Sequence, residues 1–184
     1  MIKEIHLITK NSGKILAAQK AFSKYNIKVK QISKEYPEIQ GMNSAEIAKH
    51  TAIEAAKENN VVALREDHSL YISALSGFPG PYTNYFDKTI PIETLLKMLS
   101  NFENRDAEME LSAALAFPTG EVKEFSYRVP LKLAEKPKGN KRNWDKILML
   151  KDKNKTFAES NEEDNVDVWM KNYEEISEYL TKEC

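Results

Sequence analysis

Cysteine is almost absent from this chain of 184 residues, because its one cysteine, Cys184, is the last residue. Without a second cysteine no internal disulfide or thiolate zinc site can form, so we expect a reducing, cytoplasmic environment. The three histidines, His6, His50 and His68, do not fall at metal-ligand spacing. No apolar run approaches the roughly 20 residues that a membrane span needs, and the N-terminus has no signal-peptide pattern, so we expect a soluble protein with no membrane contact.

An excess of charge of one sign is also lacking. The formal net charge is −1, from 27 basic and 28 acidic residues, which argues against a large basic face for nucleic acid. Lysines nevertheless cluster at Lys10 and Lys14 and again between Lys136 and Arg142. These lysines are either solvated, as surface lysines usually are, or they face a polyanionic small molecule such as a nucleotide.

Alternating strand and helix patterns predict an α/β protein, and the length suits a single domain over residues 1–184, or one domain with two lobes. Apolar runs and alternation predict strands at 2–9, 27–32, 61–65, 108–117 and 121–133. Helical spacing predicts helices at 12–25, 44–59, 92–99 and 165–180. Ser44 is the expected cap of the second helix, and Pro118-Thr119-Gly120 is typical of a hairpin turn.

The loop Thr9-Lys10-Asn11-Ser12-Gly13-Lys14 joins the first strand to the first helix. A hydroxyl, an amide and a lysine at a helix start suit phosphate oxygens. The alternative is that Asn11 or Ser12 only caps the helix and that the lysines are solvated.

Two adjacent carboxylates, Glu66 and Asp67, follow the predicted third strand, and Glu38 lies in a loop punctuated by Pro37 and Gly41. Catalytic groups are often placed at the carboxyl ends of strands. Together these three carboxylates could hold Mg²⁺, which takes one or two protein carboxylates and completes its shell with water and phosphate. One of them could orient or deprotonate a water molecule. The alternative for the acidic pair is a solvated turn.

Six blocks occur in one collinear order between Ile5 and about Leu180, and this order resembles the inosine triphosphate pyrophosphatase family, also called non-canonical purine nucleoside triphosphate pyrophosphatases. The blocks are Thr9-x-Asn11-x-x-Lys14, Pro37-Glu38-Ile39-Gln40-Gly41, Glu66-Asp67, the segment 74–82, Trp144-Asp145 and the segment 155–159.

The resemblance implies two α/β lobes around an elongated mixed sheet flanked by helices, a nucleotide cleft between the lobes, and a homodimer. It also implies Mg²⁺-dependent hydrolysis of ITP, dITP or XTP to the monophosphate and pyrophosphate. By the same resemblance, Thr9, Asn11 and Lys14 would contact the triphosphate. Mg²⁺ would be held by Glu38 together with Glu66 or Asp67.

Asp67 matches the family position that activates the water, and Trp144 and Asp145 match part of the loop around the base. Arg142 replaces an aromatic residue of that loop, and its guanidinium could still stack on a purine.

Other positions depart from the family pattern. Lys10 and the pair His68-Ser69 stand where the family has glycine-containing turns, Thr51 stands where it has a phosphate-binding lysine, and its Ser-His-Arg motif, which helps to recognise the 6-oxo purine, is missing. Two functions therefore remain open. The first is a pyrophosphatase with an altered base preference, and the second is a catalytically impaired descendant that binds a nucleotide or a protein partner.

Overall fold

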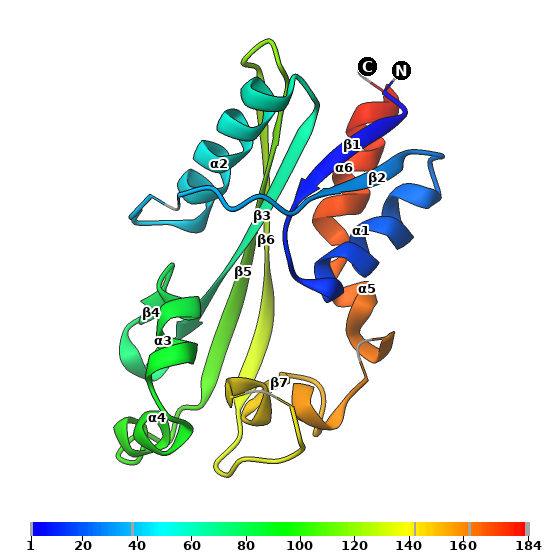
Figure 1. Ribbon diagram of the computed structural model, residues 1–184. Helices are drawn as coiled ribbons and strands as arrows, with labels where there is room; N and C mark the ends of the chain where they lie inside the picture. The colour runs from blue at the N-terminus through cyan, green and yellow to red at the C-terminus, as the bar shows by residue number, and fades with distance from the viewer. Residues whose placement is uncertain (1, 38, 142, 162, 183–184) are drawn as a thin grey trace. The chain divides into compact units, whose positions relative to one another are not determined.

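The computed structural model describes residues 2–37, 39–141, 143–161 and 163–182 and has a mixed α/β architecture (Figure 1). The strands are β1 (Glu4–Ile8), β2 (Lys28–Ile32), β3 (Ala63–Ile72), β4 (Pro79–Gly80), β5 (Asp106–Ala116), β6 (Val122–Leu133) and β7 (Leu148–Leu150). The α-helices are α1 (Ser12–Ser23), α2 (Ser44–Asn59), α3 (Thr83–Thr89), α4 (Ile92–Met98), α5 (Val166–Trp169) and α6 (Lys171–Lys182). Short 3-10 turns lie at Ser73–Leu75, Asn143–Lys146, Phe157–Glu159 and Glu163–Asn165.

The strands form one mixed sheet in the order β2-β1-β3-β5-β6-β7, and β4 pairs with β3. Strand β1 runs parallel to both of its neighbours, and its Leu7 lies opposite Leu64 of β3. The β3–β4 and β6–β7 pairs are antiparallel. A mixed sheet flanked by helices confirms the predicted fold class.

The chain divides into two compact units. Unit 1 comprises Met1–Asp67, Leu111–Tyr127 and Asn165–Cys184, and unit 2 comprises His68–Glu110 and Arg128–Asp164. Strands β3, β5 and β6 each contribute residues to both units.

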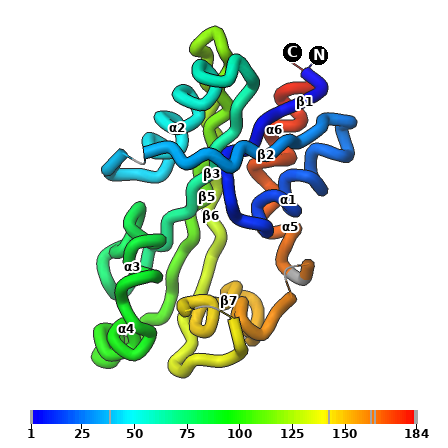
Figure 2. Tube along the Cα trace, viewed as in Figure 1, coloured from blue at the N-terminus to red at the C-terminus, as the bar shows by residue number. Residues whose placement is uncertain are grey.

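In unit 1, side chains on opposite faces of the strands pack against different helices. Leu7 and Leu64 pack with α1 and α6, whereas Ile8 and Ala63 pack with the alanine-rich face of α2. This division follows from the alternation of side chains along a strand. Figures 1 and 2 show α2 on one side of these strands and α1 with α6 on the other, and they show that β1 and α6 lie side by side although they come from opposite ends of the chain.

Three local predictions are corrected by the structure. Helix α2 begins at Ser44, but its cap is Asn43, whose side chain accepts a hydrogen bond from the N–H of Glu46 at 2.9 Å. Ser44 is instead buried, and its hydroxyl donates to the hydroxyl of Ser112 at 3.0 Å. The helix predicted over 165–180 is divided at Met170 into α5 and α6, although its predicted apolar face is confirmed by its packing in the core of unit 1.

The third correction concerns β3, which continues through the acidic pair for another five residues, to Ile72. The two carboxylates were expected to end the strand. They do not, because Leu70 and Ile72 are fully buried and extend the strand's apolar pattern, and because Glu66 is itself paired with buried groups.

Unit 2 contains the short elements α3, β4 and β7, which were not among the elements predicted from the sequence. Gly139 has a φ of +82° there and lies against the backbone of Ala158. Across the part of the chain that the structure describes, none of the helices has both the length and the apolar character needed to cross a membrane.

Candidate active site

The loop between β1 and α1 is held by its own polar side chains. The hydroxyl of Thr9 accepts a hydrogen bond from the N–H of Asn11 at 3.1 Å, and the side chain of Asn11 accepts one from the N–H of Lys14 at 3.2 Å. Asn11 is therefore the N-cap of α1, as the capping alternative predicted. Thr9 is 8% exposed and therefore largely buried, whereas Asn11 is exposed.

Lys14 reaches from α1 to β3. Its ammonium group donates a hydrogen bond to the backbone carbonyl of Glu66 at 2.7 Å. The register of the strands explains this contact: Leu7 pairs with Leu64, so β1 ends beside Arg65 and its following loop lies next to Glu66 and Asp67. The acidic pair is thus inside β3, but it lies beside the carboxyl end of β1, which is where α/β proteins commonly place polar sites.

Glu66 and Asp67 point to opposite faces of β3, because successive side chains of a strand alternate. The carboxylate of Glu66 is turned toward α6 and is 2% exposed. Asp67 is half-exposed on the face of β3 that includes Ala63 and packs with α2. The structure therefore does not join the two adjacent acids into one ligand pair.

Two side chains of α6 hold the buried carboxylate of Glu66. The hydroxyl of Tyr173 donates to it at 2.8 Å, and the side-chain amide of Asn172 donates to it at 3.3 Å. Burial and the negative charge of Glu66 raise the pKa of Tyr173 well above its ordinary value. The phenol therefore stays protonated and remains a hydrogen-bond donor to the carboxylate.

The third predicted metal ligand, Glu38, lies outside the described residues. Glu35 of the same loop forms an ion pair at 2.5 Å with Lys10 of the loop between β1 and α1, and both side chains are mainly exposed. Within the described ranges there is no group of three or more acidic, histidine or cysteine side chains that could hold a metal ion. Mg²⁺ needs only one or two protein carboxylates when phosphate and water complete its shell, so the accessible carboxylate of Asp67 fits this ion.

The predicted base-loop residues lie in unit 2. Trp144 is 2% exposed; its backbone N–H donates to the Asp87 carboxylate at 3.1 Å and its indole N–H to the carbonyl of Ile90 at 3.3 Å. These bonds anchor the turn Asn143–Lys146, in which Asp145 is half-exposed. Arg142, the predicted stacking residue, is outside the described part of the chain.

The positions that depart from the family pattern have clear structural settings. Thr51 is 2% exposed on α2, and its hydroxyl finds no hydrogen-bond partner among the described residues. In the segment where the Ser-His-Arg motif was sought, Met170 is buried, and the ammonium of Lys171 lies 5.4 Å from the centre of the Tyr127 ring.

Sequence reasoning missed Tyr173 and Asn172 as polar partners of a candidate site residue. Tyr173 falls on the apolar face of the last helix, so it was interpreted as a core residue. The available signal was its hydroxyl, because a buried tyrosine usually finds a hydrogen-bond partner.

The sequence profile of the Ham1 family matches residues 5–172. The chain belongs to the Ham1 family. This membership confirms the resemblance that the collinear blocks predicted.

Relatives in the Ham1 family match over most of their length. A dITP/XTP pyrophosphatase of Methanopyrus kandleri is 36% identical over 152 residues, which cover 82% of this chain and 81% of the relative. A dITP/XTP pyrophosphatase of Thermococcus kodakarensis is 34% identical over 158 residues, which cover 85% of each protein. The solved structure of the Staphylococcus aureus Ham1 protein has a TM-score of 0.81 and 26% identity, covering 99% of this chain and 100% of that one. A HAM1 protein from Coxiella burnetii has a TM-score of 0.79 and 25% identity at the same coverage.

Proposed function

We propose that this protein is a nucleoside triphosphate pyrophosphatase that converts non-canonical purine nucleoside triphosphates, such as dITP and XTP, into the monophosphate and pyrophosphate. The relatives named dITP/XTP pyrophosphatase support this substrate class. Because the family profile extends over segments of both units, we further propose that residues 1–184 act as one functional domain.

One observation carries the proposal. Lys14 brings an ammonium group to the backbone of Glu66 at 2.7 Å, and the next residue on β3 is the accessible carboxylate of Asp67. The cation is therefore held at the residue that immediately precedes the carboxylate on β3, and the same loop region contains the polar residues Thr9 and Asn11. Such a pairing suits a polyanionic substrate that is attacked by water.

In the proposed reaction, Asp67 orients a water molecule and accepts its proton as the water oxygen attacks the α-phosphorus. The bond between the α-phosphorus and the bridging oxygen breaks, and pyrophosphate leaves with the electron pair. Thr9, Asn11 and Lys14 would contact the phosphates, with Lys14 balancing negative charge on the leaving group. Mg²⁺, held by Asp67 with Glu38, would supply further charge neutralisation. The carboxylate of Glu66 is engaged by Tyr173, so this ligand set consists of Asp67 and Glu38.

Two further assignments rest on the resemblance, and a third rests on composition. We propose that Arg142, Trp144 and Asp145 take part in base selection, with Trp144 acting by holding the turn rather than by stacking, because it is buried.

We also propose a homodimer, which light scattering on a sizing column would test. The cytoplasmic location is proposed because a single cysteine suits a reducing compartment.

The experiment is pyrophosphate release with Mg²⁺ across ITP, dITP, XTP, ATP, GTP, CTP and UTP. Asp67→Asn should lower kcat by about 10²-fold or more, in the range expected for loss of a general base. Glu178→Gln is the matched control, because it neutralises an exposed carboxylate paired with Lys182 at 3.2 Å. Turnover should require a divalent cation and stop with excess chelator. Full activity in Asp67→Asn would refute the role of Asp67, and a folded but silent wild-type protein would favour the nucleotide- or protein-binding alternative.

A further inference from the structure

Glu66 links three elements of unit 1. Its backbone carbonyl receives the ammonium of Lys14 from α1, and its carboxylate receives the hydroxyl of Tyr173 from α6. The carboxylate is 2% exposed and the tyrosine is fully buried, so this contact is shielded from water. A carboxylate removed from water is tolerated when hydrogen-bond donors replace its hydration, and charge-assisted bonds of this kind hold their geometry well.

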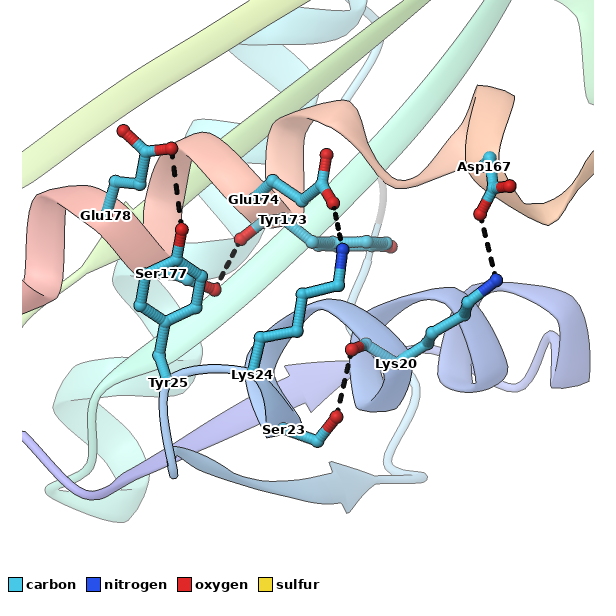
Figure 3. A network of polar contacts seen from close by, with 9 residues as sticks. All are labelled: Lys20, Ser23, Lys24, Tyr25, Asp167, Tyr173, Glu174, Ser177 and Glu178. Atoms are coloured by element: carbon cyan, nitrogen blue, oxygen red, sulfur yellow. Dashed lines mark hydrogen bonds and ion pairs between the residues drawn. The ribbon is translucent and has the colours of Figure 1, made fainter.

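Other contacts between α1 and the C-terminal helices are of a different kind. Figure 3 shows these contacts, which join Lys20 of α1 to Asp167 at 2.9 Å and, just after α1, Lys24 to Glu174 at 2.6 Å and Tyr25 to Glu178 at 3.4 Å. The side chains of the two ion pairs are substantially exposed, and exposed ion pairs contribute little rigidity. The buried bond between Tyr173 and Glu66 is therefore the better candidate for fixing local geometry.

Asn172 reinforces the same point of β3. Its side-chain amide donates to Glu66 at 3.3 Å and to the backbone carbonyl of Leu111 on β5 at 3.0 Å. The amide thus bridges α6 to two strands of the sheet. Its side-chain oxygen is buried without a hydrogen-bond partner in the described part of the chain, so the side-chain nitrogen makes the contacts that link α6 to the sheet.

We propose that Tyr173 is a positioning residue: through the carboxylate of Glu66 it fixes the segment of β3 on which Lys14 docks and from which Asp67 projects. The catalytic part of this inference rests on the proposed pyrophosphatase function. Tyr173 contacts no reacting atom in this scheme. Its effect is indirect, because the main chain of Glu66 and Asp67 shares one strand and a small displacement there moves both the cation and the carboxylate.

The kinetic test compares Tyr173→Phe with Tyr127→Phe. The control also removes a tyrosine hydroxyl from unit 1, one that donates to the carbonyl of Val168 at 2.5 Å rather than to Glu66. Tyr173→Phe should lower kcat by about 10-fold or more and change KM by less than about threefold, because misplacement of catalytic groups acts in the transition state. Tyr127→Phe should stay within about twofold of wild type in both constants. Equal kinetic effects of the two variants would overturn the proposal.

A double-mutant cycle tests the route through the carboxylate. If Tyr173 acts through Glu66, adding Tyr173→Phe to Glu66→Gln should lower kcat by less than about twofold further. An additional loss as large as that of Tyr173→Phe alone would show that the tyrosine acts elsewhere, and would overturn the proposal.

A measurement independent of turnover separates this inference from the proposed function. In NMR spectra of the unliganded protein, Tyr173→Phe should shift the backbone N–H signals of Lys14 and Asp67, whereas Tyr127→Phe should leave them in place. Unchanged signals in Tyr173→Phe would overturn the positioning role whether or not the protein is an enzyme. If Tyr173→Phe shifts these signals but the wild-type protein hydrolyses no nucleotide, the proposed pyrophosphatase function is refuted and the structural link between Tyr173 and β3 is supported.

Discussion

Replacing tyrosine by phenylalanine at three positions removes three hydroxyl groups that the fold uses differently. Tyr173 donates to a buried carboxylate at 2.8 Å, Tyr127 to a backbone carbonyl at 2.5 Å, and Tyr25 to an exposed carboxylate at 3.4 Å. All three lie in unit 1. Each substitution keeps the ring and therefore the packing, so the three free energies of unfolding compare the hydroxyl contacts alone.

The expected costs follow from burial and charge. Tyr173→Phe leaves the carboxylate of Glu66 without its shorter hydrogen bond, and bonds to charged groups are worth about 1.5–3 kcal/mol, so we expect a loss of about 2 kcal/mol. Tyr127→Phe removes a bond between neutral groups and should cost about 1 kcal/mol. Tyr25→Phe removes a long surface contact and should cost less than about 0.5 kcal/mol.

The assay is urea and thermal unfolding followed by circular dichroism at neutral pH. For a chain of this size about 1 kcal/mol corresponds to roughly 2–4 °C in Tm, so Tyr173→Phe should melt about 4–8 °C below wild type. The order Tyr173, Tyr127, Tyr25 is the essential result. If Tyr173→Phe proves as stable as Tyr25→Phe, the carboxylate of Glu66 does not depend on this donor and the reasoning is refuted.

Two other perturbations test unit 2, and the first has a glycine of unit 1 as its control. Gly139→Ala should lower the free energy of unfolding in urea by about 3 kcal/mol, because φ is +82° and the new Cβ would lie 2.4 Å from the carbonyl carbon of Ala158. Gly120→Ala is the control: φ is +95° but no atom of the described residues lies within 4 Å of the new Cβ, so only about 1 kcal/mol of backbone strain is expected. Equal losses in the two variants would contradict the clash at Gly139. The backbone N–H of Thr156 holds the pKa of Glu159 below its ordinary value of 4.5. This carboxylate therefore stabilises the fold above pH 4.5 and loses that effect as the pH falls through its lowered pKa. The Tm of Glu159→Gln should consequently fall less steeply than the Tm of wild type between pH 5 and about pH 3. Parallel profiles of Tm against pH would exclude this contribution of Glu159.

The sequence predicted the elements that carry a clear local period. The strand, loop and helix that begin the chain, the two long strands around Pro118-Thr119-Gly120 and the apolar face of the last helix were all recognised, because the pattern of apolar residues reports directly on one buried side. The capping role of Asn11 was also among the predictions, because N-caps follow from local chemistry.

The errors share a physical cause. Ser44 was expected to cap α2 because serine is a common cap, but the preceding Asn43 takes that role and the Ser44 hydroxyl finds Ser112 across the core. The carboxylates of β3 were expected to follow the strand because the short apolar run stops before them. Buried partners distant in the sequence remove the cost of burying the charge of Glu66, and a local pattern does not contain them.

By itself the sequence determined the family, the mixed α/β class and the set of candidate side chains, since collinear motifs and apolar periods are properties of the chain alone. Only the tertiary structure decided what the adjacent acids do. Alternation along β3 requires Glu66 and Asp67 to face opposite ways, but which face is covered depends on α6, whose Tyr173 is 107 residues from Glu66 in the chain. The pairing of a buried carboxylate with a phenol across that separation is a matter of packing, and packing also leaves Asp67 partly exposed at the residue after the one that Lys14 contacts.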